Sequence, residues 1–145
     1  MEIKVRARER GFTLIEIMIV VIIIGLLAAL VAPRLFGKLT TAKLKSAKAQ
    51  IELFGTALDA FRLDTGRYPT TDEGLKAFRE KPSGLESWSG PYLPKEVPVD
   101  PWGKPYIYKS PGEHGEYDLF SYGLDGTEGG EGENQDVVSW MDMVK

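Results

Sequence analysis

The apolar residues near the N-terminus form one long continuous run. From Ile17 to Pro33 the sequence contains no charged residue, and counted from Phe12 the apolar stretch is a little over 20 residues long. A helix rises about 1.5 Å per residue and needs about 20 apolar residues to cross the hydrocarbon core of a bilayer. The pattern therefore predicts a transmembrane helix over residues 12–35.

A second apolar pattern follows, with the spacing of an amphipathic helix. Its members recur at steps of four, three, four and three residues: Ala47, Ile51, Phe54, Leu58 and Phe61. This spacing places them on one helical face, which we expect to cover a small globular domain. We expect the helix to end near Gly66, a C-cap residue. Pro33 falls inside the long helical pattern, where its ring and missing N–H predict a kink or a local break.

The segment after the helix has a turn-rich pattern. Thr70 or Thr71 can cap a short helix that Pro82 and Gly84 would end. The stretch 82–105 then contains six prolines and predicts an ordered loop without regular hydrogen bonding. Its aromatic residues are expected to hold it against the core: Trp88, Tyr92 and Trp102.

Two runs near the C-terminus predict β-strands. PYIYK (105–109) and EYDLFSY (116–122) are rich in β-branched and aromatic residues and are separated by SPGEHG. We expect them to pair as an antiparallel hairpin. The fold class is therefore α+β, with a long N-terminal helix packed on a small antiparallel sheet.

Charges around the apolar run bear on its topology and processing. Cations that precede the run would stay in the cytoplasm, which sends the C-terminal bulk outward.

An ordinary cleaved signal has an apolar region of about 7–15 residues and an Ala-x-Ala-like site. This run is longer, its end (LLAALVAP) offers no clean site, and Glu16 lies inside it. A plain anchor leaves Glu16 unexplained too. Cleavage before the run, between Gly11 and Phe12, would keep the helix attached.

Overall composition excludes several classes of function. The formal net charge of −3 argues against a general nucleic-acid binder. The chain has no Cys, so a disulfide cannot staple an exported domain and a metal ion is the obvious alternative. His114 is the only His and lies in a turn, where a solvated role is expected rather than that of a catalytic base. We expect no enzymatic activity.

The stretch from Asp125 to Asp136 contains five acidic residues and several glycines. It can be a solvated mobile loop, a phosphate cradle or a site for a hard cation. The carboxylates argue against phosphate, and the absence of Cys and of further His argues against zinc. Calcium accepts six to eight oxygen ligands, including carbonyls that glycines allow to point inward. The EF-hand spacing is absent, so a calcium site here would use a different loop.

The string GFTLIE, with basic residues before it and an apolar run after it, resembles the class III signal of type IV pilins and type II secretion pseudopilins. This resemblance implies that residues 1–11 are a leader. A prepilin peptidase would cleave between Gly11 and Phe12 and N-methylate the new first residue. It also implies a role for Glu16, whose carboxylate would be costly at membrane depth unless paired. Glu16 would neutralise the Phe12 amine of a neighbouring subunit and so set the register of a polymer.

Most of the chain resembles the major pseudopilins of type II secretion, most clearly at 10–35, 66–77, 98–106 and 117–140. The resemblance implies a type IV pilin-like fold and a helical homopolymer that drives export of folded proteins. It implies a single-pass inner-membrane protein whose residues 36–145 form a periplasmic domain. The implied partners are minor pseudopilins, the prepilin peptidase, the inner-membrane assembly platform and, indirectly, the outer-membrane secretin channel. A pilin for adhesion or motility and a membrane-anchored hydrolase are the alternatives.

The resemblance also implies calcium as the cation of the acidic loop. The side chains of Asp125 and Asp136 are its expected ligands, with carbonyls from Tyr122 and Thr127, and Ser139 closing the shell. Four further residues of the loop stay open as contacts: Glu128, Glu131, Glu133 and Asn134.

Overall fold

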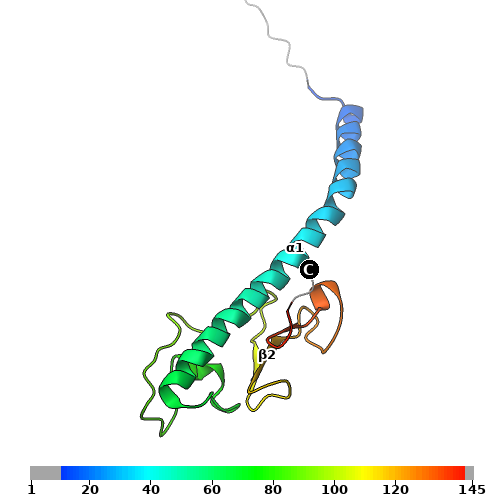
Figure 1. Ribbon diagram of the computed structural model, residues 1–145. Helices are drawn as coiled ribbons and strands as arrows, with labels where there is room; N and C mark the ends of the chain where they lie inside the picture. The colour runs from blue at the N-terminus through cyan, green and yellow to red at the C-terminus, as the bar shows by residue number, and fades with distance from the viewer. Residues whose placement is uncertain (1–10, 143–145) are drawn as a thin grey trace, which may run out of the picture. The chain divides into compact units, whose positions relative to one another are not determined.

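The computed structural model describes residues 11–142, and Figure 1 shows the arrangement of its elements. The chain divides into two compact units, one ending at Lys38 and the other beginning at Leu39. Each unit is described by itself. The division reflects how residues pack within the protein and does not test where the chain leaves the membrane. The expected end of the transmembrane segment at Leu35 therefore stays a prediction.

Helix α1 spans Leu14–Thr65 and includes both helical patterns of the sequence. The expected end is confirmed, because Gly66 has a φ of 78° and its N–H donates to the carbonyl of Arg62 at 2.7 Å. Of the two expected effects of Pro33, a local break is wrong, since α1 continues through it, and a kink stays a prediction. A proline removes one backbone donor, and the apolar turns on both sides keep their own hydrogen bonds.

The sheet has three antiparallel strands in the order β1-β2-β3. Strands β1 (Ile107–Lys109) and β2 (Asp118–Ser121) form the expected hairpin, although each is shorter than its run in the sequence. Strand β3 (Val137–Val138) pairs with β2 and was not expected. Two residues are too few to show an alternating pattern, so β3 is recognisable only from its partner. It returns the chain to the sheet directly after the acidic loop.

The core lies between the sheet and the part of α1 that follows Leu39. The predicted helical face is confirmed, because all five of its apolar residues are buried: Ala47, Ile51, Phe54, Leu58 and Phe61. Phe54 meets Tyr106 edge-on, with ring centroids 5.2 Å apart, and Leu119 and Val137 belong to the same cluster. Burying such side chains contributes about 1.5–3 kcal/mol each, which holds sheet and helix together.

The short helix after α1 is the 3-10 helix η1 (Gly74–Phe78). Thr70 and Glu73 form a reciprocal pair in the turn before it. The Glu73 N–H donates to Thr70 Oγ1 at 3.3 Å, and the Thr70 N–H donates to Glu73 Oε2 at 2.8 Å. The expected cap at Thr70 or Thr71 is wrong for this helix: the cap position of η1 is Glu73, which makes no side-chain capping bond, and the Thr70–Glu73 pair orders the preceding turn instead. A second 3-10 turn, η2 (Gly132–Asn134), lies within the acidic loop.

The proline-rich loop is held by its aromatic residues, as expected. Trp88 Nε1 donates to the carbonyl of Ala77 at 2.8 Å. Tyr92 packs edge-on against Phe61, and its hydroxyl donates to Asp64 at 2.8 Å. Trp102 packs against the core cluster.

Candidate functional site

The N-terminal end of α1 carries a local hydrogen-bonded pair at the proposed processing site. The Glu16 N–H donates to Thr13 Oγ1 at 3.2 Å, and the Thr13 N–H donates to Glu16 Oε2 at 3.4 Å. This is a capping box, in which two otherwise unpaired N–H groups of the helix terminus are satisfied reciprocally. Gly11 and Phe12 precede the helix in non-helical backbone, and Phe12 is largely exposed. Residues 1–10 of the expected leader lie outside the described residues.

The first part of α1 is long and apolar enough to cross a membrane. Its most apolar window has a mean hydropathy of 3.1, and none of that window is buried within the protein. A core helix of a soluble protein would be covered by other elements. Here large apolar side chains from Leu14 to Val31 are exposed on all sides of the helix. The exposed apolar surface is consistent with the predicted span over 12–35.

The acidic loop runs between β2 and β3 and starts with a tight turn at Asp125. The Thr127 N–H donates to Asp125 Oδ1 at 3.1 Å, which orders the turn. At the other end of the loop, Asp136 Oδ2 accepts the N–H of Gly129 at 2.8 Å. The two aspartates expected to bind a metal thus both organise the loop backbone.

Asp136 carries the least satisfied group of the loop. Its Oδ1 is buried and has no hydrogen-bond partner. Burial raises the pKa of Asp136 above the ordinary value, and the negative charges of Glu128 and Asp125 add to the increase, while the Gly129 N–H partly opposes it. A buried carboxylate oxygen without a donor is costly unless a cation or a proton reaches it.

The expected ligands differ in whether they line a cavity and in how many hydrogen bonds they already make. Tyr122 and Asp136 line one cavity of about 130 Å³ together with Glu128, one of the residues left open, whereas Asp125, Thr127 and Ser139 are not part of its lining. Ser139 is tied to β2, because its N–H donates to the carbonyl of Leu119 at 2.9 Å and its Oγ accepts the Leu119 N–H at 3.1 Å. One lone pair of that hydroxyl remains for another contact.

Glu133 points to α1 rather than to a shared metal site. Its Oε1 lies 3.5 Å from Lys43 Nζ and accepts the hydroxyl of Thr40 at 3.3 Å. This pairing argues against Glu133 as a metal ligand. Glu131 is exposed, and Asn134 lies in η2.

Within residues 11–142 no three Asp, Glu or His side chains are gathered closely enough to form a ready metal cluster. The expected ligand set does not need such a cluster, because it has two carboxylates and takes its remaining oxygens from carbonyls and a hydroxyl. This donor chemistry, together with the unpartnered Asp136 oxygen, fits calcium.

Sequence reasoning missed two residues that support the loop. Lys104 Nζ donates to the carbonyl of Leu124 at 2.6 Å, directly before Asp125. Asp100 is buried, and its carboxylate accepts the N–H of Lys104 at 2.8 Å and the hydroxyl of Ser121. The signal that could have found Asp100 is its place between prolines in PVDPWGK, where a short polar side chain organises a turn.

His114 is exposed in its turn, as expected, but its ring is also hydrogen-bonded and stacked. Its ring stacks on Trp140 with centroids 3.9 Å apart, and its Nδ1 lies 3.0 Å from Asp118 Oδ2. Asp118 is buried and also accepts the N–H groups of Glu113 and His114. Burial alone would raise the pKa of Asp118, but these hydrogen bonds lower it below the ordinary value. The pair fixes the hairpin turn to the segment after β3.

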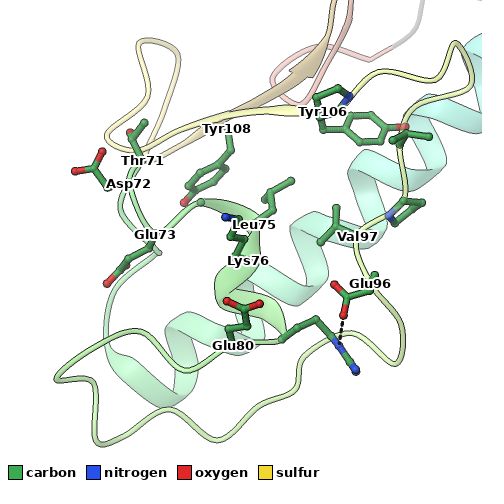
Figure 2. A pocket seen from close by; sticks show the side chains of 15 residues that line it. Thr71, Asp72, Glu73, Leu75, Lys76, Glu80, Glu96, Val97, Tyr106 and Tyr108 are labelled. Carbon is green, nitrogen blue, oxygen red and sulfur yellow. Dashed lines mark ion pairs between the residues drawn. The ribbon is translucent and has the colours of Figure 1, made fainter.

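A groove of about 480 Å³ lies away from the acidic loop, between η1 and residues 96–99. Figure 2 shows Tyr106 and Tyr108 above it and charged residues at its rim, including Glu96, which lies 3.9 Å from Arg79. Its lining contains no His, Ser or Cys that could form a nucleophile–base pair. Acidic side chains such as Glu80 and Glu96 do line it, so the groove does not decide against the hydrolase alternative, whose chemistry would use paired carboxylates.

Comparison with known proteins places this geometry in a family. Residues 34–140 match the family model "Type II secretion system (T2SS), protein G", and residues 6–32 match the "Prokaryotic N-terminal methylation motif". The chain is 46% identical over 138 residues to the type II secretion system core protein G of Pseudomonas aeruginosa, covering 93% of this chain and 97% of the relative. It is 45% identical over 136 residues to the protein of the same name from Vibrio cholerae, covering 92% of each.

A solved structure agrees with these sequence matches. The crystal structure of the major pseudopilin from the type 2 secretion system of enterohaemorrhagic Escherichia coli matches with a TM-score of 0.61 and 34% identity, covering 74% of this chain and 95% of that one. The type IV pilin-like α+β fold is confirmed by this match. The chain therefore belongs to the type II secretion system protein G family, the major pseudopilins.

Proposed function

We propose that this protein polymerises from the inner membrane into a helical pseudopilus that drives folded proteins through the outer membrane. The observation that carries the proposal is that an exposed apolar helix, capped at its N-terminus by Thr13 and Glu16, continues along the chain into a compact domain. The apolar part of α1 anchors the subunit before assembly. Cations ahead of the helix keep that end in the cytoplasm and place the domain after Leu39 in the periplasm.

Glu16 sets the register of the filament in this proposal. After cleavage between Gly11 and Phe12, a free amine stands four residues before the Glu16 carboxylate. In the apolar interior of a filament, each carboxylate neutralises the amine of the neighbouring subunit. A subunit out of register would leave both charges unpaired in a medium of low dielectric, which is strongly unfavourable. Pairing therefore selects one axial offset.

Calcium fixes the outer surface of each subunit. Asp125 and Asp136 provide the charged ligands, carbonyls of Tyr122 and Thr127 complete most of the shell, and Ser139 closes it. The bound ion supplies positive charge that offsets repulsion among the loop acids. The unpartnered Oδ1 of Asp136 supports this assignment, because a cation would satisfy it. An ordered loop then presents a constant surface to the next subunit.

The partners follow from this role. A prepilin peptidase removes the leader and N-methylates Phe12, an inner-membrane platform extracts subunits, and minor pseudopilins start the filament. The secretin channel of the outer membrane acts indirectly, as the exit for the exported protein. We infer that the subunit is structural and has no catalytic activity of its own.

The test is complementation in a type II secretion host that lacks its own major pseudopilin. The host should be the source bacterium, which supplies the matching secretion machinery. Expression of this chain there should restore export and give filaments in the sheared cell-surface fraction. A chain that yields filaments but supports motility or adhesion instead of export would indicate the pilin alternative. Hydrolytic activity of the purified protein would indicate the enzyme alternative. Either result would overturn the proposal.

A further inference from the structure

Lys104 reaches from the turn after Asp100 to the first turn of the acidic loop. Its Nζ donates to the carbonyl of Leu124 at 2.6 Å and to that of Gly123 at 3.4 Å. The ammonium also packs on Gly126, where an added Cβ would lie 2.7 Å from Nζ. A side chain at residue 126 would displace it, so glycine and lysine fit each other at this position.

The backbone on both sides of this contact is fixed by Asp100. Its Oδ1 accepts the N–H groups of Lys104 at 2.8 Å and Trp102 at 3.0 Å. Its Oδ2 accepts the hydroxyl of Ser121, whose oxygen in turn accepts the N–H of Gly123 at 3.2 Å. Asp100 and Ser121 are both buried. The Lys104 side chain and the loop turn are therefore held by one connected network, with little freedom to drift apart.

We propose that Lys104 is a positioning residue for the calcium loop, an inference that rests on the calcium site of the proposed function. Gly123 and Leu124 lie between two proposed ligand residues, Tyr122 and Asp125. By bonding their carbonyls, Lys104 removes them from competition for the cation and fixes the turn in which Asp125 sits. The metal then meets a loop whose first half is already ordered.

Two effects of Lys104 on calcium affinity have opposite signs. A positive charge near a cation site repels the ion, whereas a preordered loop avoids the entropy cost of ordering on binding. Long-range repulsion between solvent-accessible charges is screened by salt. The ordering effect acts through direct hydrogen bonds and is not screened in this way. We therefore expect ordering to dominate at physiological ionic strength, and the sign of a substitution at Lys104 decides between the two effects.

The experiment is calcium titration of the full chain in detergent by isothermal titration calorimetry at 0.15 M salt. Lys104→Met keeps the aliphatic length without the donor and should bind calcium about tenfold more weakly. Lys104→Arg keeps a cationic donor and should bind within about threefold of the parent. The matched control Lys95→Met, at an exposed lysine outside this network, should bind as the parent does. Lys104→Leu replaces the Met variant if the latter fails to fold, and the same weakening is expected, because leucine also lacks a donor.

Three results would overturn the inference. Equal or tighter calcium binding by Lys104→Met would show that positioning does not dominate. A lower melting temperature of Lys104→Met with an unchanged Kd would show a purely structural role. Absence of calcium binding by the parent would remove the calcium site itself and this inference with it. The Asp136→Ala variant separates these failures, because it should lose binding whenever the site is real, whatever Lys104 does.

Discussion

Thr13 and Glu16 cap the N-terminus of α1 reciprocally, each backbone N–H donating to the other's side-chain oxygen. Glu16 therefore has a partner within its own chain before any neighbour arrives. In a filament the same carboxylate is proposed to pair with the Phe12 amine of another subunit. The cap and the ion pair place different demands on the side chain, because glutamine can replace glutamate in a capping box but carries no charge.

Glu16→Gln should separate the two roles. We expect this variant to insert into the membrane and keep its helix, but to give few filaments, because the neighbouring amine loses its counter-charge. Thr13→Ala should show the reverse, with loss of the cap at about 1 kcal/mol and filaments retained. Filament yield in sheared cell-surface fractions, together with export of a reporter protein, measures both. Parental filament yield from Glu16→Gln would mean that capping suffices and that the register is set elsewhere.

The TLIE string could have been recognised as a capping box from the sequence alone, since Thr and Glu three positions apart before an apolar run are its signature. The amphipathic face of α1 and its end at Gly66 were predictable for similar reasons, because periodicity and a glycine cap are local signals. Strand β3 and the contacts of Lys104 were not predictable. Val137 becomes a strand only by pairing with Ser121, and Lys104 meets Leu124 through the folded sheet.

Processing should remove residues 1–11 and leave a chain that begins with N-methyl-Phe12. Gly11 and Phe12 lie outside the helix, so a protease can reach the bond between them without unwinding α1. Intact-mass spectrometry of the membrane-extracted protein from cells with and without prepilin peptidase decides this. A mass that matches the full chain in both cells, or a cut near Ala32, would contradict the prediction.

The segment from Gly25 to Pro33 should lose helical hydrogen bonds when subunits assemble, although α1 is continuous through it here. Glycine costs about 1 kcal/mol relative to alanine in a helix interior, and proline lacks a backbone donor. Breaking the helical hydrogen bonds of this segment therefore costs less free energy than breaking them elsewhere in the apolar part of α1. Neighbouring subunits can shield the freed groups from lipid. A filament density map tests the idea, and a helix that is unbroken from Gly25 through Pro33 in the filament would dismiss it.

The pairing of Asp118 with His114 predicts that acid lowers the stability of the folded chain in a defined pH range. The pKa of Asp118 is lowered in the folded state, and an unfolded Asp titrates near 3.9. A depressed carboxyl pKa contributes stability that is present above the unfolded pKa and is lost as the pH falls through the folded pKa. Asp118→Asn should therefore lower the melting temperature of the chain at neutral pH, and the difference from the parent should shrink below about pH 4.

Near-ultraviolet circular dichroism can follow this melting, because Trp140 stacks on His114. A matched control is Glu116→Gln, which changes a neighbouring but exposed carboxylate. If the deficit of Asp118→Asn stays constant from pH 7 to pH 2, the contribution of Asp118 is packing rather than charge.

The raised pKa of Asp136 predicts two effects of lowering the pH: the metal-free fold becomes more stable, and calcium binding becomes weaker. Its pKa is raised, so the folded state disfavours the ionised form. The sign is therefore the reverse of that for Asp118: without metal, protonation of Asp136 favours the folded chain as the pH falls from neutrality toward the ordinary carboxyl range. Calcium needs the ionised form, so its affinity should fall over the same range.

Asp136→Asn should accordingly raise the melting temperature in chelator, because it removes a buried charge whose Oδ1 has no partner, and it should abolish the gain from calcium. For the parent, calcium at a hundredfold excess over Kd should stabilise the fold by about 2.7 kcal/mol, a shift of the order of ten degrees. Asp125→Ala should also lose the calcium gain, whereas Glu131→Gln, at an exposed position of the same loop, should keep it. Thermal melting of the full chain in detergent, with calcium and with chelator, provides every comparison. If the parent melts at the same temperature in calcium and in chelator, the loop binds no calcium and its acidic residues form a solvated surface.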